Sequence, residues 1–337
     1  MEDEPRLAGR GIRQSMSGLH TWSGLLLGWV LYAMFLTGTA AYFKDELSQW
    51  MRPELAHQAQ VPDQAVVAQR VADEFARTMP GAAQWSLKLS DARNNSVYAF
   101  WFTGPRGGGA RGFGEGYFDP ATGRKVAARD TMGGDFFYRF HFQFHYMPTL
   151  WGRWLAGVAA MFMLVAIISG VITHKKIFVD FFAFRCGKGQ RSWLDAHNAL
   201  SVFGLPFHFM ITYTGLVTLM ALYMPWGERI AIKPPQRAAY NAELSGFAPG
   251  GGASGVAAPL ASVEAMVRQA QERWGREGVA RVNATNPGDA AARVTVTRAE
   301  AGRVSMSPQL MEFDGVTGAL LNVRESVGAA AEARGVL

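Results

Sequence analysis

The stretch TWSGLLLGWVLYAMFLTGTAAYF, from Thr21 to Phe43, runs for 23 residues without a charged side chain. A helix needs about 20 apolar residues to cross the hydrocarbon core of a bilayer, so this stretch predicts a membrane-spanning helix. The run is longer than the apolar part of a signal peptide, and no cleavage site of the A-x-A type follows it before Lys44. We therefore expect the segment to be retained.

Two further stretches predict membrane spans. The run WLAGVAAMFMLVAIISGVIT, from Trp154 to Thr173, has 20 uncharged residues, and the segment from Ala196 to Trp226 contains no Asp, Glu, Lys or Arg. The third segment ends in YMPW, in which interfacial aromatic residues flank a helix-stopping proline. The composition agrees, because only 18% of the residues are charged, which is low for a soluble chain of 337 residues.

Composition also excludes several classes of site. The single cysteine, Cys186, rules out a disulfide or a cysteine-based zinc or iron–sulfur centre within one chain. The net charge is +6, but the basic residues form no stripe interleaved with aromatic residues. We therefore expect no nucleic-acid partner, and any redox centre must use ligands other than cysteine.

The loop between the second and third spans predicts the orientation of the chain. This loop, HKKIFVDFFAFRCGKGQRSWLD, holds five Lys or Arg residues against two Asp, which indicates the cytoplasmic side. Arg6, Arg10 and Arg13 before the first span agree with a cytoplasmic N-terminus. The long segments after the first and third spans then face the periplasm, and we expect a multi-pass protein of the bacterial inner membrane.

The two outside segments look like copies of one module. In each, an amphipathic helix (AVVAQRVADEFARTM or SVEAMVRQAQERW) precedes strand-like runs and a turn of the form D-x-x-T-G. These turns, Asp119–Gly123 and Asp314–Gly318, are 195 residues apart, and the helices align at the same offset. The offset predicts an internal repeat of a small α+β module.

These patterns predict an α-helical membrane protein with three visible spans and two small α+β extracytoplasmic modules. The predicted order is a cytoplasmic N-terminus (1–19), a first span (20–43), a first module (44–140), a second span with its periplasmic lead-in (141–174), a cytoplasmic loop (175–194), a third span (195–224) and a second module (225–337).

The histidines carry the main functional signal, because all but one lie in or beside the spans. A polar side chain at bilayer depth costs a few kcal/mol unless it has a partner, and the three apolar runs contain no Asp or Glu to complete a proton relay. A metal is the remaining common partner of neutral imidazole, and haem iron takes axial histidines. The candidate ligands are His20, His141, His145, His174, His197 and His208, whereas His57 is expected at the surface.

Helical spacing arranges these histidines at two depths. Eleven residues turn through about 1100° and rise about 16 Å, so His197 and His208 share one helix face at two levels. His20, His174 and His197 lie at the inner ends of the spans, and two of them could hold an inner haem.

His141 and His145 are spaced i, i+4, on one face of any helix that leads into the second span, and with His208 they are candidates for an outer haem. This outer site requires that the second helix begins before Trp154, that it tilts, or that residues 134–150 fold back toward the membrane.

Other roles remain open for five of these histidines. Positions 20, 174 and 197 suit interfacial histidines, position 208 suits a hydrogen bond between helices, and position 141 suits a loop or a contact with substrate. Gly38, Gly170 and Gly215 are either ordinary small-residue contacts between helices or places where close approach makes room for a flat macrocycle.

Several motifs together resemble a known family. They are LHTWSGLLLG at the first span, SGVITHKKIF at the end of the second, KGQRSWLDAHNALSVFGLPFHFMITYTGL, and the two D-x-x-T-G turns. The chain thereby resembles the PepSY-associated transmembrane helix family, iron-regulated inner-membrane proteins that include siderophore reductases of the FoxB type.

The resemblance implies a haem b protein with two haems that passes electrons across the cytoplasmic membrane, reduces ferric siderophores in the periplasm and releases Fe(II). It carries the ligand positions over to His20, His145, His174, His197 and His208, with His141 as a further position. It also implies PepSY-like outside modules and a fourth span after the second module, which either follows the end of this chain or is missing from this member.

The functions that compete with a di-haem ferric-siderophore reductase come from other classes. The first is a membrane-anchored PepSY module that binds or inhibits a partner without redox activity. The second is a transporter subunit, which the lack of intramembrane carboxylates and of broken inverted repeats disfavours. A redox role needs an electron donor, and because the chain has no G-x-G-x-x-G fingerprint after a strand, we expect a quinol or a separate reductase.

Overall fold

The chain folds into two compact units in the computed structural model. The helical unit contains Met1–Lys44 and Gly134–Ala231, and the sheet unit contains Asp45–Gly133 and Ile232–Leu337. The structure describes residues 11–55, 63–91, 96–104, 112–174, 176–237, 239–240, 252–275, 278–299 and 309–324. His57, Arg6 and Arg10 lie outside these described residues.

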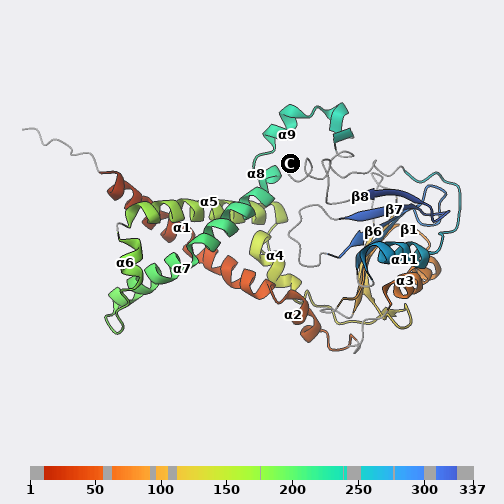
Figure 1. The fold of residues 1–337 in the computed structure, drawn as a ribbon, viewed down its shortest axis with the longest axis horizontal. Helices are drawn as coiled ribbons and strands as arrows, with labels where there is room; N and C mark the ends of the chain where they lie inside the picture. The colour runs from red at the N-terminus through yellow and green to blue at the C-terminus, as the bar shows by residue number, and fades with distance from the viewer. Residues whose placement is uncertain are drawn as a thin grey trace, which may run out of the picture. The chain divides into compact units, whose positions relative to one another are not determined.

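Three long helices dominate the helical unit (Figure 1). They are α1 (Ile12–Ala41), α5 (Thr149–Thr173) and α7 (Gln190–Thr218), and each is long and apolar enough to cross a membrane. The shorter helices of this unit are α4 (Asp135–Gln143), α6 (Ile177–Phe181), α8 (Met220–Tyr223) and α9 (Trp226–Ala231).

The long helices bury small and polar side chains and expose large apolar ones. Of their residues, α5 buries Gly152, Ala156, Gly157, Ala159 and Ser169, α1 buries Ser23, and α7 buries Asp195 and Thr212. In contrast, Trp29 is 84% exposed and Phe203 is 74% exposed. This pattern reverses that of a soluble core and is typical of helices that face lipid. The protein is therefore a membrane protein with several spanning helices.

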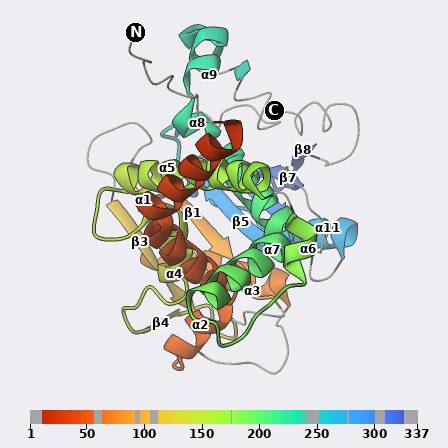
Figure 2. The same cartoon turned by 90° about the vertical axis from the view of Figure 1, so that its left-hand side faces the viewer.

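The segment that leads into the second span folds back on the bundle. Helix α4 ends at Gln143, because Phe144 (φ 55°) and Tyr146 (φ 63°) adopt left-handed backbone conformations and Pro148 precedes α5. Helix α4 then packs against both α1 and α5 (Figure 2). Of the three arrangements that an outer histidine site required, the structure has two: α5 begins at Thr149, before Trp154, and α4 folds back on the bundle. The prediction that His141 and His145 share one helix face is wrong, since His145 lies beyond the end of α4.

The sheet unit contains one eight-stranded antiparallel sheet in the order β4-β3-β2-β1-β5-β6-β7-β8. Strands β1 and β5 pair at its centre, with Leu87 opposite Val282. The strands are β1 (Ala82–Lys88), β2 (Val97–Thr103), β3 (Gly112–Phe118), β4 (Lys125–Val126), β5 (Val279–Thr285), β6 (Arg293–Arg298), β7 (Leu310–Asp314) and β8 (Leu320–Arg324). The two repeated segments are thus halves of a single sheet.

Helices α3 (Gln64–Thr78) and α11 (Val263–Trp274) lie side by side on one face of the sheet (Figure 1). The buried side chains of both helices and both halves of the sheet form one hydrophobic core. Within it, the ring of Phe75 stacks on Trp85 with centroids 5.7 Å apart. Further helical segments of this unit are α2 (Lys44–Met51), which starts at the last residue of the helical unit, and the 3₁₀ turn η1 (Pro234–Gln236).

The two D-x-x-T-G turns have matching geometry. Gly123 and Gly318 have φ angles of 72° and 73°, which glycine adopts without strain, and each donates its N–H to the carbonyl of the aspartate that opens the turn. The carboxylate of Asp314 also accepts hydrogen bonds from the N–H groups of Thr317 and Val316. These bonds, that of Thr317 first, hold the pKa of Asp314 below its usual range.

Candidate functional site

Two candidate histidines meet between α1 and α7. The ring centroids of His20 and His197 are 6.1 Å apart, with an interplanar angle of 66°. Two imidazoles that share one metal ion through bonds of about 2 Å have centroids about 6 Å apart. The separation of this inner pair therefore fits two axial ligands of one metal ion.

A backbone hydrogen bond decides which nitrogen of His20 is available. Nδ1 lies 2.8 Å from the carbonyl oxygen of Ala166 in α5. Because a carbonyl only accepts, Nδ1 must carry the hydrogen, and Nε2 of the neutral ring keeps the lone pair that a metal needs. Metal-binding histidines commonly have this kind of outer hydrogen bond, which fixes the tautomer and the direction of the ring.

A second level lies further along α1. His141 from α4 donates from Nδ1 to the carbonyl of Met34 over 2.7 Å, and its Nε2 is likewise left as the acceptor. The ring of His208 from α7 lies 5.4 Å from that of Phe35. Met34 and Phe35 follow His20 by 14 and 15 residues, so the second level is about 22 Å from the first along the helix. His197 and His208 both contact α1, as their spacing in α7 predicts.

An apolar cavity of about 100 Å³ adjoins His141. Its lining includes Ala156 and Ala160 of α5 and Thr212 and Gly215 of α7. The volume is below the range of about 300–1,000 Å³ typical of ligand pockets, so the surrounding helices would have to move apart to admit a macrocycle.

The donor set fits haem ligation. His20 and His141 each have a free Nε2, and each ring faces a helical glycine: Gly170 opposite His20 and Gly38 opposite His141. A bis-histidine haem site needs two ligands per iron and no third protein ligand. The described residues contain no group of three or more His, Cys, Asp or Glu side chains that could hold a metal ion.

The other two candidates, His145 and His174, have different partners in the structure. His145 donates from Nε2 to the carbonyl of Phe136 over 2.8 Å and stacks on the ring of that residue at 4.4 Å. The nitrogen that His20 and His141 keep free is therefore occupied in His145. His174 caps the C-terminus of α5, with Nδ1 3.8 Å from a carboxylate oxygen of Asp180, and this nitrogen has no hydrogen-bond partner among the described residues.

Sequence reasoning missed the backbone partners of the histidines. It noted Gly38 and Gly170 as small residues but did not connect them with His141 and His20. A usable signal exists in hindsight, since a glycine at bilayer depth is a position where a side chain of another helix can reach the backbone. The carbonyls of Met34 and Ala166 carry no sequence signal, because every residue has one.

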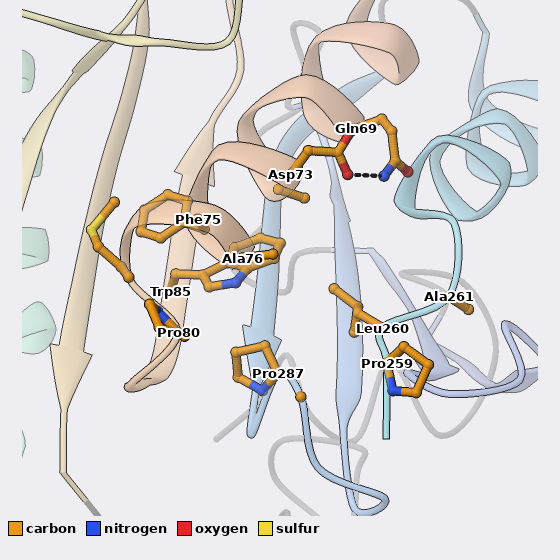
Figure 3. A pocket seen from close by; sticks show the side chains of 13 residues that line it. Gln69, Asp73, Phe75, Ala76, Pro80, Trp85, Pro259, Leu260, Ala261 and Pro287 are labelled. Atoms are coloured by element: carbon orange, nitrogen blue, oxygen red, sulfur yellow. Dashed lines mark hydrogen bonds between the residues drawn. The ribbon is translucent and has the colours of Figure 1, made fainter. Parts of the chain in front are cut away.

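The sheet unit has a separate groove of about 290 Å³ (Figure 3). On one side α3 contributes Gln69, which donates to the carboxylate of Asp73 over 2.7 Å. On the other side the groove is lined by Pro259, Leu260 and Pro287. The lining is mostly apolar, which suits the binding of an apolar segment.

These features define a class: a membrane protein whose spanning helices carry facing histidines and whose second unit contains an antiparallel sheet with two covering helices. The model of a protein family described as PepSY-associated TM region matches residues 17–328. The chain belongs to this family, which confirms the resemblance inferred from its motifs. Comparison with the curated proteins and with the solved structures gave no match.

Proposed function

We propose that this protein is a haem b membrane oxidoreductase that passes electrons across the cytoplasmic membrane to ferric siderophores in the periplasm and releases Fe(II). The observation that carries the proposal is the inner pair, His20 and His197, with centroids 6.1 Å apart and Nε2 of His20 free. Membership of the PepSY-associated family supports it.

Four histidines would hold two haems under this proposal. His20 and His197 would hold the inner one, and His141 and His208 the outer one, with His145 and His174 as the further positions that the resemblance implies. A bound haem supplies one-electron transfer, and its axial ligands and surroundings set the potential. The chain itself orients the rings through the carbonyls of Ala166 and Met34 and surrounds the outer level with apolar side chains such as Met163 and Leu216.

Reduction of a ferric siderophore would release its iron. Ferric iron is a hard ion that oxygen chelators hold tightly, and reduction to the softer Fe(II) weakens that ligation. The proposal places the N-terminus and the α6–α7 loop in the cytoplasm and the sheet unit, with its two PepSY-like halves, in the periplasm, with a fourth span as the family resemblance implies. The electron donor is a quinol or a separate reductase.

The decisive experiment is an absorption spectrum of the full-length protein extracted from membranes, oxidised and then reduced with dithionite, with haem quantified per chain. We expect two haems with bis-histidine bands, one of which is lost in His197→Ala. Reduction of a ferric siderophore is then followed with an Fe(II)-specific chelator. A preparation without a Soret band, or a band that persists unchanged in both His197→Ala and His208→Ala, would refute the proposal.

The groove of the sheet unit supports a second candidate function, a membrane-anchored module that binds or inhibits a partner without redox activity. Its apolar walls and its prolines suit an extended apolar peptide segment (Figure 3). This function predicts that the full chain binds such peptides and that Ala76→Arg, at the groove wall, abolishes the binding. It also predicts that His197→Ala has no effect on the protein's activity in cells.

A further inference from the structure

The same local arrangement occurs twice in the helical unit, on two different helices. In α5, the carbonyl of Ala166 accepts the hydrogen bond from His20, and Gly170 lies four residues later. In α1, the carbonyl of Met34 accepts the hydrogen bond from His141, and Gly38 again lies four residues later. Both carbonyls belong to helix interiors, where the N–H of the fourth residue along is their regular partner.

Helix geometry explains why a glycine is needed at that position. A helical side chain points toward the N-terminus and covers the turn before its own Cα. Any side chain four residues after a carbonyl therefore covers that carbonyl from outside. Glycine leaves it open, so that the carbonyl can accept a hydrogen bond from a neighbouring helix in addition to those from its own helix, which include the hydroxyl of Thr37 for Met34 and that of Ser169 for Ala166.

The space at the two glycines supports this explanation. A Cβ added to Gly38 would lie 2.6 Å from Nδ1 of His141 and 2.8 Å from its Cε1, distances at which the ring must move. A Cβ added to Gly170 would lie 3.1 Å from Cε1 and 3.2 Å from Nδ1 of His20, which is tight but less severe. Gly204 differs, because the ring of His208 lies over it within the same helix.

We propose that Gly38 and Gly170 are positioning residues that open the carbonyls of Met34 and Ala166 and thereby fix His141 and His20 in the Nδ1–H tautomer, with Nε2 presented as the ligand atom. The part of this inference that concerns haem rests on the proposed function. Glycine is less favourable than alanine inside a helix, and the hydrogen bond to histidine gives each of these glycines a compensating role.

The test compares Gly38→Ala and Gly170→Ala with Gly28→Ala in the full-length protein. Gly28 lies in the same helix as Gly38, and a Cβ added there meets nothing within 4 Å. Outer hydrogen-bond partners of metal ligands typically contribute about 10–100-fold to affinity, so we expect a loss of haem affinity in this range for Gly38→Ala. The loss should be smaller for Gly170→Ala, and Gly28→Ala should bind haem like the wild type.

The tautomer is measured separately by ¹⁵N NMR of labelled histidine in the same proteins without haem. We expect protonated Nδ1 in His20 and His141 of the wild type and a changed signal for the facing histidine in each glycine variant. If Gly38→Ala does not fold, Gly170→Ala keeps the test open, because its Cβ has more room.

The outcomes separate the two proposals. If wild type and both glycine variants bind haem equally and give the same ¹⁵N signals, the positioning role is wrong and the oxidoreductase proposal stands. If the wild type binds no haem but the ¹⁵N signals change as expected, the oxidoreductase proposal fails, and the glycines still position the two rings.

Discussion

At the scale of single residues, the hydrogen bond that a histidine donates decides which of its two nitrogens it can offer to a metal. His141 and His145 are close in sequence, but the first donates from Nδ1 and the second from Nε2. We therefore predict that His141→Ala loses one haem per chain and that His145→Ala retains both. Haem per chain, measured from the reduced pyridine complex, tests the difference. Loss of haem in His145→Ala with full retention in His141→Ala would contradict the assignment.

Asp289 provides a residue-scale prediction about pH in the sheet unit. Its carboxylate accepts hydrogen bonds from the N–H of Ala291, from the N–H and hydroxyl of Ser254, and from the N–H of Gly255. These bonds, that of Ala291 first, lower the pKa of Asp289 to about 2. Since the unfolded pKa is about 3.9, the stabilisation is complete above that value and is lost as the pH falls through about 2.

We expect the thermal midpoint of the wild type to fall more between pH 5 and pH 2 than that of Asp289→Asn, whose amide does not titrate in this range. The variant should also be less stable than the wild type at pH 7, because the amide is a weaker acceptor than the carboxylate. Thermal unfolding of the full chain in detergent, followed by circular dichroism, measures both effects. Equal pH dependence in the two proteins would count against the role of Asp289.

At the scale of elements, the pairing of β1 with β5 makes the two halves of the sheet one cooperative body. Phe313 of β7 is fully buried in the core that both halves share. Phe313→Ala should lower the free energy of unfolding by about 3–5 kcal/mol. Because the core is continuous, hydrogen exchange should accelerate in β1 and β2 as well as in β5–β8.

Exchange measured by mass spectrometry on the full chain distinguishes a shared core from two independent ones. Leu321→Ala is the matched control, since Leu321 is in the same half but 50% exposed. Faster exchange confined to β5–β8 in Phe313→Ala would show that the halves unfold separately.

The sequence predicted elements best where a pattern is long and local. The three apolar runs predicted the spanning helices, and the offset of 195 residues predicted matching helices, strands and turns in the two repeated segments. The end of α4 was not predictable in the same way, because Phe144 and Tyr146 are not residue types that mark a turn, yet both adopt left-handed conformations. The pairing of β1 with β5 joins segments almost 200 residues apart, for which local patterns hold no information.

The sequence predicted which histidines are candidates for the site, but not which of them face each other or which nitrogen each one leaves free. Histidines at bilayer depth are conspicuous, and helix arithmetic predicted two levels. Which histidines face each other depends on the packing of α1, α4, α5 and α7, and the tautomers depend on backbone carbonyls that the sequence does not mark.

At the scale of the whole molecule, the single cysteine reports the orientation of the chain in the membrane. Cys186 is exposed in the α6–α7 loop, next to Arg185, whose guanidinium forms two hydrogen bonds with the carboxylate of Asp195 at the start of α7. The positive charge of the loop predicts a cytoplasmic location. We expect a membrane-impermeant maleimide to label the wild type in inverted vesicles and not in intact spheroplasts. Cys186→Ser is the control without a reactive group, and labelling in spheroplasts would reverse the orientation.

The joined sheet also affects how the chain avoids association with other chains. Two separate four-stranded sheets would present four unpaired outer strands, two of them the seven-residue strands β1 and β5, which are rich in buried apolar residues. The unpaired N–H and C=O groups of such strands can pair with strands of other molecules, which favours aggregation. In the joined sheet these two strands satisfy each other, and the outermost described strands are the shorter β4 and β8. Fragments that separate the halves should therefore aggregate, whereas in the intact chain the pairing of β1 with β5 prevents either strand from pairing with another molecule.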